Sequence, residues 1–285
     1  MTVVDSLPPP RRLDRLAVRA ARAAGTVDGV RLATRALSLI AAVALWQWAS
    51  ARHLNLRLVD FRNVPAPTEV AAAAVALFGS PKLGQHIRSS LVRVFAGFAV
   101  AAVVGVGLGL LVGRLKRAAD LLLPLLEMLR PIPGVAWIPL AILMFPSSEL
   151  SMVFITFMGA LFPILLNTVH GVEALDRRVV ASSRALGARS VALFREVILP
   201  GALPSIVTGL SIGMGTAWFC LVTAEMISGQ YGIGYYTWES YNLQRYPDIV
   251  VGMLFIGLFG MASSFLVKAV GARLTPWYRL EGRTP

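Results

Sequence analysis

Repeated long apolar segments constrain this chain more than any other feature of its sequence. Six of them approach or exceed the roughly 20 residues that a helix needs to cross a ~30 Å hydrocarbon core. Only 15% of the 285 residues are charged and 56% are hydrophobic, which is rare in a soluble domain of this size. The sequence therefore predicts an all-α membrane protein with six transmembrane helices. The expected spans are about 32–51, 91–112, 121–145, 151–169, 206–227 and 249–270.

The distribution of basic residues predicts the orientation of these spans. Most of the 27 lysines and arginines fall in residues 1–35, 114–117, 171–204 and 268–285, which lie on one side of a six-span protein. The positive-inside rule places that side in the cytoplasm. We therefore expect a cytoplasmic N-terminal tail (1–31), a transmembrane domain (32–270) and a cytoplasmic C-terminal tail (271–285). Arg12, Arg15, Arg19 and Arg22 share one helical face, which either lies on an anionic membrane surface or is simply solvated.

A stripe of small residues in the second span predicts close helix packing. Gly97, Ala101, Gly105, Gly109 and Gly113 recur every four residues and so share one face of the helix. In lipid, small residues at such a face let two helices approach closely.

A basic, non-apolar stretch lies between the fourth and fifth expected spans, at residues 171–204, and its pattern is helix, glycine, helix, proline. Ala181–Leu186 can form about two helical turns, and Gly187 permits a bend. Ser190–Leu199 resumes a helical period that Pro200 is expected to stop. A basic unit of this kind, placed between spans, is suited to contact the surface of a partner.

This stretch resembles the cytoplasmic loop of the membrane subunits of bacterial ATP-driven importers, which is written E-A-A-x3-G-x9-I-x-L-P. The chain thus resembles an ABC importer permease with the type I fold, of the branch that serves nitrate, sulfonates, taurine and bicarbonate. Its Ala-Ser-Ser replaces the Glu-Ala-Ala of the family, so a charged contact to the ATPase is missing there. The resemblance implies an ATPase-coupling loop made of Ala181, Ser182, Ser183, Leu186, Gly187, Ala188, Phe194, Val197, Leu199 and Pro200.

The resemblance also implies the partners. A cytoplasmic ABC ATPase dimer would hold ATP and Mg, and no cofactor would be bound by this chain. A second permease copy in a homodimer and a periplasmic or lipid-anchored solute-binding protein would complete the importer in the bacterial inner membrane. No nucleic-acid partner is expected. The chain would form the path for a small anion such as a sulfonate, taurine, nitrate, bicarbonate or an organic carboxylate.

The third span is interrupted by prolines, and irregular backbone at membrane depth survives only where it faces protein or a water-filled path. Two intramembrane charges, Arg130 and Glu225, are candidates to line such a path. The alternative is a structural ion pair, in which Arg130 contacts Glu225 or Glu127, or a charge that reaches the membrane surface. The full candidate set for the pathway is Arg130, Trp137, Asn167, Thr216, Trp218 and Glu225, although such residues also pack between helices.

The sequence excludes several kinds of chemistry. The dipeptide Gly-Lys does not occur, so there is no Walker A loop with which the chain could bind ATP itself. The three histidines and the single cysteine form no metal-binding or catalytic motif. The alternative function is an ion-coupled secondary transporter, which would normally show inverted repeats and intramembrane acids.

Overall fold

The computed structural model describes residues 10–55 and 60–278, with side chains from residue 31 onward. In that part of the chain the only pairing of β type is an isolated bridge between Asn55 and Asp60. The predicted arginine face near the N-terminus and residues 279–285 of the predicted C-terminal tail lie outside the described side chains. The helices are α1 (Pro10–Ala51), α2 (Pro67–Phe78), α3 (Leu83–Arg114), α4 (Lys116–Leu129), η1 (Gly134–Trp137), α5 (Ile138–Met144), α6 (Ser148–Glu173), α7 (Arg177–Ala185), α8 (Ser190–Ala192), η2 (Leu193–Ile198), α9 (Leu199–Ser228), α10 (Ile233–Asn242) and α11 (Tyr246–Leu274).

The prediction of an all-α membrane protein is confirmed. Five helical stretches of the described chain are long and apolar enough to cross a membrane, and they lie in α1, α3, α6, α8–α9 and α11. A sixth span exists if α4 and the η1–α5 segment are counted together, although they are bent by 84°. The chain divides into two compact units, Met1–Ala71 and Ala72–Pro285, and the second holds every element from α3 onward.

The 84° bend lies where the sequence predicts a broken third span. Pro131 and Pro133 follow the end of α4, and neither has the backbone N–H that would continue its hydrogen bonds. Pro133 adopts an extended conformation with ψ of 138°, after which η1 and α5 start in a new direction.

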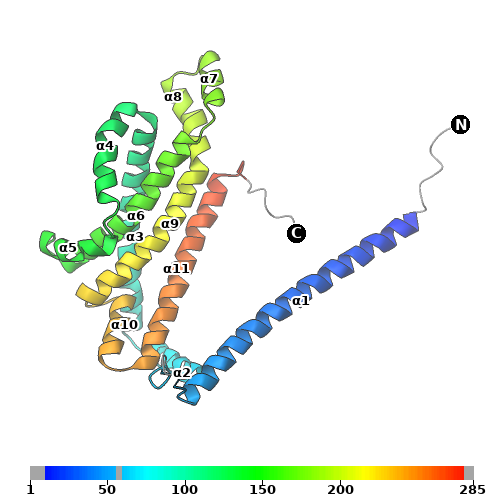
Figure 1. Ribbon diagram of the computed structural model, residues 1–285, viewed down its shortest axis with the longest axis vertical. Helices are drawn as coiled ribbons and strands as arrows, with labels where there is room; N and C mark the ends of the chain where they lie inside the picture. The colour runs from blue at the N-terminus through cyan, green and yellow to red at the C-terminus, as the bar shows by residue number, and fades with distance from the viewer. Residues whose placement is uncertain (1–9, 56–59, 279–285) are drawn as a thin grey trace. The chain divides into compact units, whose positions relative to one another are not determined.

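The second unit is built on α3, α6 and α9, which pack side by side along most of their length (Figure 1). The stripe of small residues on α3 faces α6, as its spacing predicts. At Gly97 the facing residue is Thr156, at Gly109 it is Thr168, and at Gly113 it is Val172. On the other side of α6, Gly209 and Gly213 of α9 lie against Asn167 and Ile164. Glycines on two helices thus allow α6 to lie close to both neighbours.

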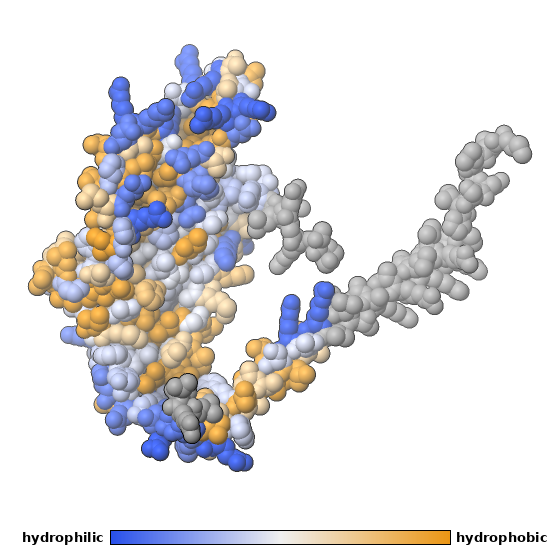
Figure 2. Space-filling model, viewed as in Figure 1, coloured by the Kyte–Doolittle hydropathy of each residue, from blue (hydrophilic) through white to orange (hydrophobic). Residues whose placement is uncertain are grey.

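The polarity of the second unit matches a membrane setting. Figure 2 shows a broad apolar zone in its middle, with hydrophilic side chains gathered at the end that carries α7 and α8 and at the opposite end near α10. Large apolar side chains are exposed on the helices of this unit, such as Leu143 on α5, Phe219 on α9 and Phe265 on α11. Such an apolar surface is unfavourable in water, so we expect lipid or a partner subunit to cover it.

The structure corrects one local prediction. Pro200 does not stop the helix that begins at Ser190, because α8, η2 and α9 follow one another without a gap. Pro200 lies in the first turn of α9, directly after the π-helical segment η2. The change from wide π-type turns to α-helical turns resets the hydrogen bonding at that point, so the missing N–H of Pro200 is tolerated.

Candidate functional site

Two parts of the second unit combine polar chemistry with a specific geometry, and they lie at its opposite ends. The first is the loop region around α7, which we call the coupling loop and define as residues 171–204. The second is a network of buried polar side chains where α3, α6 and α9 meet the segment before α10. The described residues 31–55 and 60–278 contain no cluster of three or more His, Cys, Asp and Glu that could hold a metal ion.

The coupling loop presents α7 as a short, well-capped helix. Asp176 is its N-cap, and the Oδ1 atom accepts a hydrogen bond of 2.8 Å from the backbone N–H of Arg178. Such a cap satisfies a donor that would otherwise lack a partner at the helix start. The helix begins at Arg177, four residues before the predicted turns at Ala181.

Gly187 ends α7 in the left-handed region, with φ of +88°. This conformation lets the N–H of Gly187 donate to Arg184 O and the N–H of Ala188 donate to Ser183 O, both at 3.0 Å. Glycine is the residue that adopts this conformation without steric strain. The predicted bend at Gly187 is therefore confirmed, and it reverses the chain between α7 and α8.

The predicted loop residues divide into an exposed tip and a buried base. Leu186 is 89% exposed beside the bend, and Ala181 and Ser182 are also exposed, whereas Ser183 and Ala188 are half-buried. Val197, Leu199 and Pro200 are half-buried at the base, next to the buried side chains of Leu193 and Ile198. An exposed apolar tip on a firmly packed base is the arrangement that a docking element needs.

Phe194 links the base of the loop to the end of α3. The guanidinium of Arg114 lies 5.1 Å from the centre of the Phe194 ring, within the range of a cation–π contact. Arg114 also donates a 3.0 Å hydrogen bond from Nη2 to Ser190 O. These two contacts join the start of the α8–η2 segment to the end of α3.

A wide hollow of about 1420 Å³ opens between the end of α3 and the coupling loop. Its charged lining is almost entirely basic, with Glu173 as its acidic member. An acidic surface of a partner would complement this hollow. The basic residues that line it are Arg114, Lys116, Arg177, Arg184 and Arg189.

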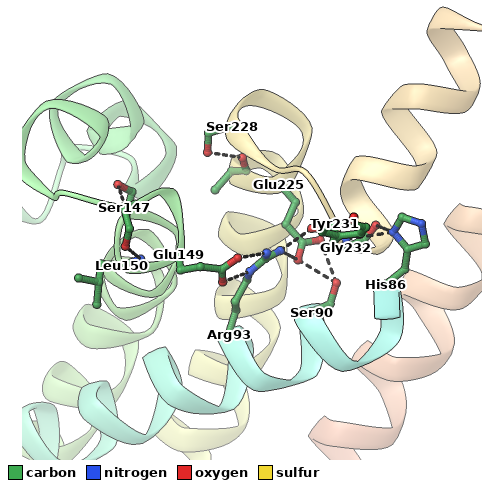
Figure 3. A network of polar contacts seen from close by, with 12 residues as sticks. His86, Ser90, Arg93, Ser147, Glu149, Leu150, Glu225, Ser228, Tyr231 and Gly232 are labelled. Carbon is green, nitrogen blue, oxygen red and sulfur yellow. Dashed lines mark hydrogen bonds and ion pairs between the residues drawn. The ribbon is translucent and has the colours of Figure 1, made fainter. Parts of the chain in front are cut away.

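At the opposite end of the unit, Arg93 of α3 is enclosed by acceptors from three directions (Figure 3). Its Nε donates to Glu149 Oε2 at 2.7 Å, and its Nη2 donates to Glu149 Oε1. Its Nη1 donates to Glu225 Oε1 at 2.9 Å and to Tyr231 O at 2.6 Å. The side chain of Arg93 is 2% exposed, so each of these bonds is needed to offset the loss of water.

Glu225 has further donors of its own. Ser90 Oγ lies 2.8 and 2.9 Å from the two carboxylate oxygens, and Gly234 N–H donates to Oε2 at 3.0 Å. Gly232 leaves room for the carboxylate, because a Cβ at this position would collide with Glu225. Its φ of +134° is also a backbone conformation that favours glycine. Glu225 therefore fixes the turn between α9 and α10 from inside.

His86 extends the network to the same turn. Its Nδ1 lies 3.1 Å from the N of Gly232 and 3.0 Å from its carbonyl oxygen. The imidazole ring is stacked on Tyr235 at 6.2 Å and lies beside Tyr236 at 5.8 Å. Three tyrosines, Tyr231, Tyr235 and Tyr236, thus lie around one histidine.

The structure does not bring the six candidate pathway residues together into one site. Glu225 pairs with Arg93 and not with Arg130, which corrects the possible Arg130–Glu225 pair. Trp218 is a core residue that donates to Ser263 Oγ at 2.7 Å and stacks on Phe259.

The other candidates are distributed over α6, α9 and the broken span. Asn167 donates to Pro163 O at 2.8 Å and packs on Gly209, and Thr216 donates to backbone carbonyls of its own helix. Arg130 is exposed at the end of α4 and has no ion-pair partner among the described residues. The indole N–H of Trp137 is buried without a hydrogen-bond partner in the described chain.

Sequence reasoning missed the importance of Arg93, Ser90, His86 and Glu149. One signal was available, because an arginine inside an apolar segment requires a carboxylate partner. Sequence reasoning considered only Arg130 as an arginine partner of Glu225, although Arg93 also lies inside an expected apolar span. The contact between α3 and α9 decides that assignment.

Comparison with known proteins agrees with this architecture. The family model for the binding-protein-dependent transport system inner membrane component matches residues 104–280, more than half of the chain. The nitrate import permease protein NrtB of Synechocystis sp. is 36% identical over 223 residues, which cover 75% of this chain and 81% of the relative.

Two further relatives are named for the transport of other anions. The aliphatic sulfonates transport permease protein SsuC of Escherichia coli is 36% identical over 245 residues, or 85% of this chain and 92% of the relative. The bicarbonate transport system permease protein CmpB of Synechococcus elongatus is 36% identical over 174 residues, or 61% and 63% of the two chains. The chain therefore belongs to the binding-protein-dependent inner membrane components, as an ABC importer permease of the nitrate, sulfonate and bicarbonate branch.

Proposed function

We propose that this permease forms the membrane path for a small anion, which a solute-binding protein delivers from outside and a pair of cytoplasmic ATPases drives inward. ATP and Mg would be held by the ATPases, and the chain itself would carry no cofactor and catalyse no reaction. A second copy of the permease would complete the path in the bacterial inner membrane, with both termini in the cytoplasm. The named activities of the relatives point to nitrate, sulfonates or bicarbonate, and taurine or an organic carboxylate would have similar chemistry.

The observation that carries the coupling part of this proposal is the form of the coupling loop. Its tip exposes Leu186, and its end is bent by Gly187 in a left-handed conformation. The basic hollow beside it would accept acidic side chains of an ATPase. Because Arg114 ties Ser190 and Phe194 to the end of α3, a displacement of the loop would move the spans together.

The test of coupling is affinity purification of the permease with its ATPase from native membranes. We expect Leu186→Asp to abolish co-purification and ATP-driven uptake, because a charge would replace the apolar tip. Leu243→Asp is the matched control, since Leu243 is 55% exposed after α10, at the opposite end of the unit. Both variants must first match the wild-type yield and unfolding midpoint. Equal ATPase recovery with the two variants would refute the assignment of the loop, and uptake driven by an ion gradient alone would favour a secondary transporter.

For the path itself we propose that Arg130 supplies positive potential to the anion. Support comes from its place beside the broken backbone of the third span, its exposure, and the absence of a described ion-pair partner. The nearby α5 side of the break also holds the unpartnered indole N–H of Trp137, a donor that an anion could use. We expect Arg130→Ala to reduce uptake of labelled nitrate or taurine strongly and Arg130→Lys to retain much of it. Normal uptake by Arg130→Ala would rule out this role.

A further inference from the structure

We propose that Arg93 is a positioning residue that holds the outer end of the permease closed through one permanent partner, Glu225, and one releasable partner, Glu149. We call the Arg93–Glu149 contact the outer latch. Its part in transport rests on the proposed function, whereas its mechanical behaviour can be measured without any transport. The word "outer" refers to the end of the unit away from α7 and α8, where α10 lies (Figure 1).

The two carboxylates differ sharply in their surroundings. The side chain of Glu225 is 0% exposed, and Ser90 Oγ and Gly234 N–H hold it together with Arg93. The side chain of Glu149 is 65% exposed, and Arg93 is its only partner in the described chain. Water can therefore replace Arg93 at Glu149, but it cannot reach the carboxylate of Glu225 without opening the helix bundle.

The charges of the cluster also favour the release of Glu149 over the release of Glu225. One guanidinium faces two carboxylates, so the cluster carries one negative charge in excess when all three are ionised. If Glu149 leaves, a neutral Arg93–Glu225 pair stays buried and the excess charge moves into water. The Nε and Nη2 donors of Arg93 must then be met by water that enters from the exposed side of Glu149. If Glu225 left instead, its buried donors on Ser90 and Gly234 would lose their partner. Buried charges and donors without partners are strongly unfavourable, so the latch opens at Glu149.

The position of Glu149 determines what the opening would free. It lies in the first turn of α6, directly after the turn that joins α5 to α6. That corner is held together by Ser151 Oγ, which donates to Ala141 O of α5 at 3.0 Å. Release of Glu149 would therefore remove the ion pair that ties the α5–α6 corner to α3, and would leave that corner held by the apolar cluster that contains Ala141, Met152 and Val94.

The rest of the outer end would stay in place. Glu225 keeps α9 and the turn before α10 attached to α3 (Figure 3). One helical turn below the latch, Gly97 packs directly against Thr156, so the movement of α6 would be limited to its first turns. The latch thus separates a fixed part of the outer end from a movable corner that is continuous with the broken third span.

Cysteine labelling of the full-length permease in lipid nanodiscs tests this proposal. In a Cys220→Ser background, Met152→Cys reports on the movable corner and Ala224→Cys reports on the fixed part, because both native side chains are 1% exposed. We expect Glu149→Gln to raise the maleimide labelling rate at position 152 about tenfold, as loss of a modest stabilising contact would do. The rate at position 224 should change less than about twofold by the same reasoning. Glu149→Asp, which keeps the charge, should give an intermediate rate at position 152.

Three results would overturn the proposal. Unchanged labelling at both positions would mean that Glu149 holds nothing closed. Equal increases at both positions would mean that the ion pair stabilises the whole bundle and not one corner. A larger increase in labelling rate at position 224 than at position 152 would mean that the part assigned as fixed is the part that moves. The proposed function is tested separately by uptake, so selective labelling without ATP-driven uptake would retain the latch and refute the transport role.

Discussion

The contact between α3 and α6 can be tested by adding a single methyl group. A Cβ at Gly109 would lie 2.5 Å from Thr168 Cβ and 2.8 Å from the carbonyl oxygen of Leu165. The carbonyl belongs to the α6 backbone and cannot rotate away, so the two helices would have to separate. Gly107 lies on the same helix two residues earlier, and a Cβ there would meet nothing within 4 Å. Gly109→Ala and Gly107→Ala therefore add the same methyl group to the same helix, but only the methyl group at position 109 meets α6.

The expected magnitudes follow from these distances. Replacing glycine with alanine inside a helix stabilises it by about 0.5–1 kcal/mol, and Gly107→Ala should show that gain or no change. Overpacking costs about 1–3 kcal/mol, so Gly109→Ala should reduce the free energy of unfolding by a net ~1–2 kcal/mol. Gly105→Ala should fall between the two, because its Cβ would lie 3.0 Å from Ile164 Cγ2.

The assay is unfolding of the purified permease in mixed detergent micelles with increasing SDS, followed by tryptophan fluorescence. The order of stability should be Gly107→Ala, then Gly105→Ala, then Gly109→Ala. If Gly109→Ala proved as stable as Gly107→Ala, α3 and α6 could not be packed as described. Loss of stability in Gly107→Ala alone would also refute the reasoning, because it would place the contact on the wrong face of α3.

Substitutions at four further positions have definite expected outcomes. Gly187→Val should weaken ATPase recovery in pull-downs, because a β-branched residue at φ +88° is strained by about 1–2 kcal/mol, while Gly187→Asn should weaken it less. Asp176→Ala should remove the cap of α7, at a cost of about 1 kcal/mol, and speed tryptic cleavage at the start of that helix. Trp218→Phe should reduce the free energy of unfolding in the SDS assay by about 1 kcal/mol, because phenylalanine has no N–H to donate to Ser263. Burial, together with the nearby Asp248 carboxylate, raises the pKa of the Tyr236 hydroxyl above its unfolded value of about 10. The protonated hydroxyl therefore stabilises the folded state below pH ~10, and this stability is lost as the pH rises through the higher pKa of the folded state. Tyr236→Phe cannot ionise, and its unfolding midpoint should therefore fall less than that of the wild type between about pH 9 and 12.

The sequence by itself determined the membrane class, the small-residue face of α3, the break in the third span and the bend at Gly187. Each of these depends on local chemistry or on a regular period: long apolar runs require helices in lipid, prolines interrupt hydrogen bonding, and glycine permits a left-handed turn. The family resemblance through the coupling loop belongs to the same level, because its residues are close together in the chain.

Only the tertiary structure decided which charges meet. Arg93, Glu149 and Glu225 come from three helices far apart in sequence, and sequence reasoning had considered only Arg130 as an arginine partner of Glu225. The continuation of the helix through Pro200 also could not be inferred, because it depends on a π-helical segment held by the packing of Leu193 and Ile198. Pairing and register of this kind are set by how whole helices pack against one another, and no local pattern in the chain encodes them.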